Sequence, residues 1–166
     1  MALTAPKPAP SGAVHEVGVD ELFFSTTDAR GVIERSNDVF VRLSHYEREQ
    51  LGGAPHNIIR HPEMPGGAFR AMWDTLESGA PFAAYVRNLA ANGSEYDVLA
   101  TVTPLHGGGY LSVRTRPVVE ELYATATAVY AEARALEDER LADAGRILEL
   151  LAGEGLEDYE SFQNTV

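Results

Sequence analysis

The sequence contains no cysteine, and this absence excludes several chemistries. Disulfide bonds, thiolate catalysis, cysteine-ligated zinc and iron–sulfur clusters all need cysteine, and none occurs in the 166 residues. A long hydrophobic run is also missing, because no stretch of about 18 apolar residues appears. We therefore expect a cytoplasmic protein that is not embedded in a membrane.

Positive charge is scarce as well. The chain has 13 Lys and Arg against 25 Asp and Glu, a net charge of -12. Nucleic acids and anionic membranes bind through Lys and Arg that displace counterions, so neither is an expected partner. Hydrophobic residues nevertheless make up 45% of the chain, enough for one buried core. We expect a disordered leader at 1–13, a single domain at 14–117 and an extension at 118–166.

The middle of the sequence combines strand signals with short helix signals. Two apolar runs flank the turn Asp28–Gly31 and predict a β-hairpin. Asn37 suits the N-cap of a short helix, and the prolines between 51 and 65 restrict that segment to short helical turns. A second, amphipathic helix is expected at 66–79. Three strand segments follow, at 81–90, 94–105 and 108–116, and the glycine run 107–109 is interpreted as the hairpin turn between the last two.

This order of elements predicts the fold class α+β. Two strands, a group of short helices and three further strands would form a five-stranded antiparallel sheet with helices on one face. From residue 118 onwards, apolar residues recur every three or four positions, from Leu122 through Leu136 to Leu151. Such a stripe must pack against the domain or against a second copy of the chain. The extension is therefore a candidate dimer or output element.

Several motifs resemble the PAS domain of bacterial aerotaxis receptors, a family that binds FAD without a covalent bond. The resemblance covers residues 25–116. It rests on STTD at 25–28, SNDVFVRLSHY at 36–46, HNIIRHPEMP at 56–65, AMWDTLESGAPF at 71–82, VRN with NG at 86–93 and YLSVRTR at 110–116. It implies a PAS fold and a redox or oxygen sensor.

The resemblance also implies a set of cofactor-binding residues. Those that match the family are Asn37, Arg60, His61, Trp73 and Asn88. Glu63 and Phe82 belong to the same set, although the family usually has Asp and Trp at these positions. The family also has Trp at the position of Asp97 and a basic run at that of 89–91.

The chemistry of two of these residues suits a flavin. Asn88 can donate and accept hydrogen bonds at the edge of an isoalloxazine ring, and Arg60 presents a planar fork for phosphate or a ring oxygen. The imidazole of His61 can respond to the charge of the cofactor. Structural roles remain open: Asn88 could end a strand before the Asn92–Gly93 turn, and Arg60 could pair with Glu63. Trp73, on the apolar face of its helix, could be a core residue.

Haem b is the alternative cofactor, with His56 or His61 as the axial ligand. A third interpretation is a PAS module without cofactor, used for dimerisation or as an adaptor. A metal site at His56, His61 and Glu63 is not favoured, since the spacing is not HExxH. No catalytic motif occurs, which favours a sensor over an enzyme. As partners we expect a second copy in a homodimer and a downstream signalling protein.

Overall fold

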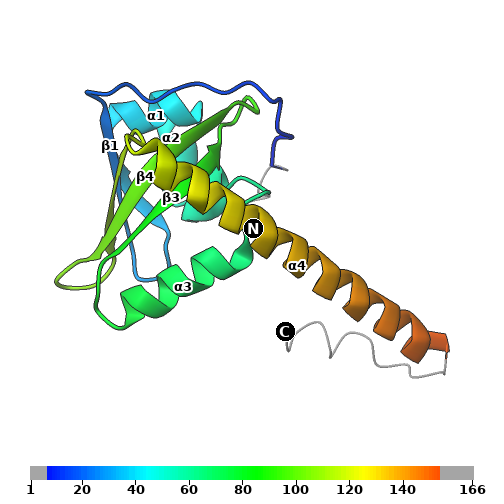
Figure 1. Ribbon diagram of the computed structural model, residues 1–166. Helices are drawn as coiled ribbons and strands as arrows, with labels where there is room; N and C mark the ends of the chain where they lie inside the picture. Colours follow the sequence, from blue (N-terminus) through cyan, green and yellow to red (C-terminus); the bar gives the residue numbers. More distant parts are fainter. Residues whose placement is uncertain (1–6, 154–166) are drawn as a thin grey trace.

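The structure, a computed structural model, describes residues 7–153 and the side-chain environments of residues 7–142 (Figure 1). Five strands form one antiparallel sheet in the order β2-β1-β5-β4-β3. The elements in chain order are β1 (Leu22–Thr27), β2 (Ile33–Ser36), α1 (Asp38–Ser44), α2 (Arg48–Leu51), η1 (His56–Ile59), α3 (Gly66–Glu77), β3 (Phe82–Leu89), β4 (Glu95–Pro104), β5 (Tyr110–Thr115) and α4 (Glu120–Gly153). The predicted fold class, strand number and helix positions are confirmed.

The two faces of the sheet have different neighbours because side chains alternate along each strand. On β4, Tyr96, Val98 and Ala100 are buried and face the short helices. The neighbouring positions, such as Asp97, face the opposite side, where α4 lies. The core lies between the sheet and the short helices. It contains Val17, Phe23, Ile33, Phe40, Leu43, Leu51, Ile59, Ala90, Tyr96, Val98 and Ala100.

Local chemistry explains where the short elements begin and how the hairpins close. Asn37 caps α1, since its Oδ1 accepts a hydrogen bond from Phe40 N at 3.2 Å. The turn between β4 and β5 brings Gly109 very close to Thr27. A Cβ at Gly109, whose φ is +81°, would lie 2.1 Å from Thr27 O. Glycine is therefore required there, and the glycine run is a hairpin turn, as predicted.

The N-terminal segment is attached to the domain. Part of the predicted disordered leader, residues 7–13, runs beside the turn between β3 and β4. Ser11 N donates to Gly93 O at 2.8 Å, and Glu95 N donates to Ala13 O at 2.8 Å. These backbone bonds explain the difference from the composition-based prediction, because even a segment rich in Pro, Ala and Gly can be fixed by pairing with an exposed sheet end. Residues 1–6 lie outside the described residues.

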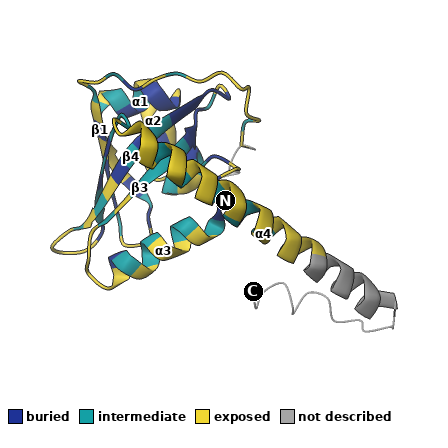
Figure 2. Cartoon of the chain, viewed as in Figure 1, coloured by how far each residue is buried: buried dark blue, intermediate teal, exposed yellow. Residues whose placement is uncertain are grey.

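Helix α4 crosses the sheet and then extends away from it (Figures 1 and 2). Tyr123, Ala126 and Tyr130 are half-buried against the domain. The other side of the helix leaves Leu122, Val129 and Leu136 exposed. The predicted stripe is therefore divided between a face on the domain and a free face, and its part beyond residue 142 lies outside the described side chains. No helix in the described part of the chain is long and apolar enough to cross a membrane.

Candidate functional site

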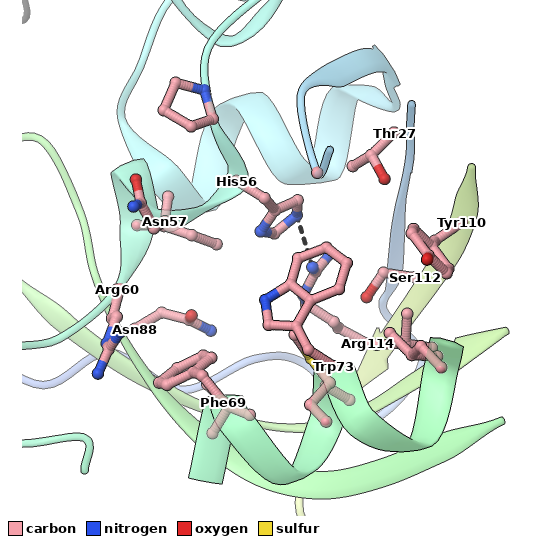
Figure 3. Close-up of a pocket in the computed structure, with 18 of the residues that line it drawn as sticks. Thr27, His56, Asn57, Arg60, Phe69, Trp73, Asn88, Tyr110, Ser112 and Arg114 are labelled. Carbon is pink, nitrogen blue, oxygen red and sulfur yellow. Dashed lines mark hydrogen bonds between the residues drawn. The ribbon is translucent and has the colours of Figure 1, made fainter. Parts of the chain in front are cut away.

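A cavity of about 290 Å³ lies between the inner face of the sheet, η1 and α3 (Figure 3). Helix α3 contributes Phe69, Met72 and Trp73 to its wall, so the amphipathic face predicted from the sequence faces the cavity. The sheet contributes Val86 and Asn88 from β3 and residues of β4 and β5. The volume is at the lower end of the range for small-molecule sites, and the wall is mostly apolar. The cavity can therefore hold a flat organic group.

A buried arginine lies at the sheet side of this cavity. Arg114 of β5 is 5% exposed. Its Nη2 lies 2.6 Å from His56 Nε2, and its Nη1 donates to Ser25 Oγ at 3.2 Å. Because a guanidinium only donates, His56 Nε2 accepts and carries no proton. Among the described residues no carboxylate pairs with Arg114; its other neighbours are the rings of Phe23 and Phe40, 5.3 and 5.5 Å away.

Burial controls the ionisation of both partners. Desolvation lowers the pKa of Arg114 to about 10, which still leaves it charged at neutral pH. Desolvation, with a smaller contribution from the charge of Arg114, lowers the pKa of His56 well below its usual value of 6.5. His56 is therefore neutral. The pair carries one positive charge that no acidic side chain in the described part of the chain compensates.

Two further polar atoms in the wall of the cavity have no hydrogen-bond partner in the structure: Asn88 Nδ2 and Ser112 Oγ. Both residues are nearly inaccessible, at 3% and 4% exposure. Figure 3 shows the Asn88 amide pointing into the cavity. Buried polar groups normally find partners, and an unpaired one costs about 1–3 kcal/mol. Both atoms are free to hydrogen-bond to a polar group inside the cavity.

Arg60 follows η1 and borders the same cavity. Its guanidinium stacks over the Phe69 ring at 4.0 Å, and its Nη2 donates to Met64 O at 3.3 Å. A backbone bridge joins Arg60 to Asn88 of β3. The structure therefore brings three of the predicted residues, Arg60, Trp73 and Asn88, to one cavity.

The other predicted residues lie elsewhere. Asn37 does not line the cavity, because its side chain holds α1 against β1: Oδ1 also accepts from Phe24 N and Nδ2 donates to Leu22 O. Phe82 begins β3 opposite Val102 and is outside the cavity lining.

His61 and Glu63 also lie outside the cavity lining. His61 is 1% exposed and points Nε2 toward Glu95 Oε1 at 3.5 Å, while its Nδ1 accepts from Glu63 N. Glu63 pairs with Arg87 at 3.6 Å. The alternative Arg60–Glu63 ion pair is not found, because the two side chains turn to opposite sides of the Pro-rich corner.

Sequence reasoning missed Arg114, Ser112 and Ser25, and it considered His56 only as a ligand of haem iron or of another metal ion. A signal for two of them was present. On β5, Tyr110, Ser112 and Arg114 alternate with apolar residues, which puts them on one face of the strand. What the sequence could not show is that this face is the buried one.

The outer face of the sheet holds a second polar cluster, in which every charge is paired. Arg87 Nε and Nη2 contact Asp97 Oδ1 and Oδ2 at 3.0 and 3.2 Å. The hydroxyl of Tyr123 on α4 donates to Asp97 Oδ2 at 2.5 Å. These contacts raise the pKa of Arg87, with the Asp97 hydrogen bonds as the largest cause. The cluster borders a second cavity of about 410 Å³ beneath α4.

Comparison with known proteins identifies the domain. Residues 33–110 match the family described as the PAS fold. Two solved light-oxygen-voltage domains share the architecture. The light state of the blue-light photoreceptor Aureochrome1 LOV gives a TM-score of 0.56 at 21% identity, covering 64% of this chain and 88% of that one. A domain solved with a flavin analogue gives 0.54 at 21% identity, covering 72% and 88%. The chain therefore carries a PAS domain.

Two sequence relatives show which type of PAS domain the chain carries. The chain is 44% identical over 109 residues to the aerotaxis receptor of Escherichia coli (strain K12), covering 63% of this chain and 22% of the receptor. It is 31% identical over 81 residues to a nitrogen fixation regulatory protein of Klebsiella pneumoniae, covering 49% and 16%. Its domain is a PAS domain of the aerotaxis-receptor type. The chain spans about a fifth of the length of that receptor.

Proposed function

We propose that the domain binds a flavin, FAD, in the inner cavity and reports redox state or oxygen. The observation that carries the proposal is the buried charge of Arg114, which no carboxylate of the described chain compensates. A flavin ring has an edge of carbonyl oxygens and ring nitrogens that accepts hydrogen bonds and gains negative charge on reduction. Arg114 and the Asn88 amide would contact that edge. The match to an aerotaxis receptor supports the same proposal.

The remaining wall fits the other parts of a flavin. Trp73, Met72 and Val86 offer apolar surface for a flat ring. Arg60, whose backbone is bridged to that of Asn88, would pair with a phosphate or a ring oxygen. A bound flavin supplies the redox chemistry, because its ring system accepts electrons and protons. The residues of the chain would place a fixed cation, Arg114, at the ring edge and keep His56 neutral.

Haem is a weaker candidate because neither predicted histidine can serve as its axial ligand in this geometry. His56 Nε2 is occupied by Arg114, 2.6 Å away. His61 Nδ1 accepts from Glu63 N and its Nε2 points toward Glu95, away from the cavity. A cationic guanidinium beside a ligating nitrogen would also oppose an iron cation. Both facts favour the flavin.

The absorption spectrum of the purified full chain tests the proposal. We expect two flavin bands, and chromatography of the released cofactor should identify FAD. A Soret band would select haem instead, and a colourless protein that takes up neither FAD nor haem on titration would leave the adaptor module as the function.

A change in the redox state of the cofactor would be passed from the domain to α4 and to the proteins that bind this helix. The exposed residues Leu122, Val129 and Leu136 are seven positions apart, a spacing typical of a helix that pairs with another helix. We propose a homodimer through this face, with a downstream signalling protein as the recipient of the signal. Light scattering of the wild type and of a Val129→Glu variant tests the dimer, and an unchanged monomeric mass in both would contradict it.

A further inference from the structure

Helix α4 is attached to the wall of the cavity by one carboxylate. Glu137 Oε2 accepts a hydrogen bond from Gly66 N at 2.9 Å, and Oε1 accepts one from Gly67 N at 2.8 Å. These amides open α3, and the first amides of a helix have no partner inside it. Pro65, the N-cap residue, makes no side-chain cap bond. The cap of α3 therefore comes from α4, 71 residues further along the chain.

The capped helix is the one that forms the cavity wall. Phe69, the first lining residue of α3, comes two positions after Gly67, and Trp73 follows one turn later. Trp73 packs edge-on against Tyr110 of β5, with ring centroids 5.4 Å apart. A change in the position of the α3 N-terminus thus changes the width of the cavity. A carboxylate also suits this place, because the helix dipole is positive there.

Arg60 connects the same carboxylate to the cavity through charge. A methyl group added at Gly66 would lie 3.5 Å from Glu137 Oε1 and 3.8 Å from Arg60 Nη2, so both groups border one narrow space. Burial lowers the pKa of Arg60, and the charge of Glu137 partly offsets that effect. Arg60 therefore faces the cavity on one side and Glu137 on the other.

We propose that Glu137 is a positioning residue that latches α4 onto α3, so that docking of this helix is coupled to occupancy of the cavity. The proposal rests on the proposed flavin function only for the identity of the ligand. A ligand that orders α3 and engages Arg60 stabilises the capped position, and the latch in turn favours ligand binding, because coupling between two sites is reciprocal. Tyr123 anchors the beginning of α4 separately through its hydrogen bond to Asp97, so we expect the fold to survive loss of the Glu137 contact.

Hydrogen exchange of the Gly66 and Gly67 amides in the full chain tests the latch directly. In Glu137→Ala we expect both amides to exchange about fivefold faster, the effect of losing a cap. Glu137→Gln should restore most of the protection, because its carbonyl oxygen still accepts. The matched control is Glu132→Ala, which removes an exposed acid from the same helix. Unchanged exchange in Glu137→Ala would overturn the latch.

FAD titration of the same proteins tests the coupling. Glu137→Ala should bind FAD about fivefold more weakly than the wild type and the Glu132→Ala control, and FAD should slow exchange of Gly66 and Gly67 in the wild type. Equal FAD affinity in all three proteins would overturn the coupling. A wild type that takes up no flavin would refute the proposed function, and the coupling would then be tested with the cofactor that the protein does bind. A protein that binds no cofactor would overturn the coupling. The latch is tested separately, by hydrogen exchange of the chain without cofactor.

Discussion

Arg87 and Arg114 project from opposite faces of one sheet into opposite electrostatic surroundings. Arg87, on the outer face, has Asp97 at 3.0 Å and a raised pKa. Arg114, on the inner face, has a histidine and a serine as partners and a pKa lowered to about 10. A charge that the protein itself neutralises holds structure together. A charge that it leaves without a counterion inside a cavity is, in our proposal, the contact for the ligand.

The sharpest way to test this comparison is to remove the inner charge. Arg114→Met should weaken flavin binding by more than a hundredfold, about 3 kcal/mol, because a hydrogen bond to a charged group is lost in a buried site. The free energy of unfolding should change by less than about 1 kcal/mol, since the lost cation was itself costly to bury. Cofactor content and chemical denaturation measure the two effects. Arg116→Met, a half-exposed arginine paired with Glu16, is the matched control.

Removing the acidic partner of Arg87 on the outer face should have the opposite result: it should lower stability and leave flavin binding unchanged. Asp97→Ala leaves Arg87 and Tyr123 without their shared acceptor and should destabilise the domain by about 1.5 kcal/mol, the cost of breaking a part-buried charged hydrogen bond. Flavin content should stay at the wild-type level. Denaturation monitored by circular dichroism checks the first effect, with exposed Asp138→Asn as the control. A variant that lost its flavin while remaining folded would contradict the division between the two faces.

Removing the unpaired Asn88 amide on the inner face should weaken flavin binding less than removing the Arg114 cation. Asn88→Ala removes one neutral donor and should weaken flavin binding about fivefold to tenfold, near 1 kcal/mol. Ser112→Ala removes the other unpaired group and should have a smaller effect. Fluorescence quenching of FAD on titration measures both affinities. If Asn88→Ala binds FAD as tightly as the wild type, the amide does not contact the cofactor.

The smallest expected effect is on pH dependence. The pKa of His56 is lowered in the fold, so the unfolded chain binds the extra proton first, and stability falls as the pH drops below 6.5. We expect a loss of about 1 kcal/mol between pH 7 and pH 5.5. His56→Gln, whose side chain still accepts a bond from Arg114, should flatten this slope. His15→Gln serves as a comparison because the pKa of His15 is also lowered by burial. An equal slope in wild type and His56→Gln would contradict the assignment.

The fold could be predicted from the sequence because its signals are local. Asn37 was recognised as a cap, the glycines at 107–109 as a turn and the face with Trp73 as a packed helix side. Each depends on residues within a few positions of one another. Long-range pairing was not readable: the bond between Ser11 and Gly93 fixes a segment whose composition suggests disorder.

The site was harder to predict for the same reason. Arg60, Trp73 and Asn88 were found through the resemblance to a family, which also suggested Asn37, His61, Glu63 and Phe82. The sequence cannot show whether a polar residue points into a cavity or satisfies backbone groups beside it, as Asn37 does. Nor can it show that Arg114 has no carboxylate partner among the described residues, because that depends on which side chains distant segments of the chain bring next to it.

The connection between the sheet and the C-terminal helix is short. Only residues 116–119 separate Thr115 of β5 from Glu120 of α4, and Arg114 is the penultimate residue of that strand. A four-residue connection that contains Pro117 has few free backbone torsions, so we expect a twist of β5 to be passed to the helix. Flexible residues inserted after Arg116 would therefore leave cofactor binding intact while disconnecting the strand from the helix mechanically.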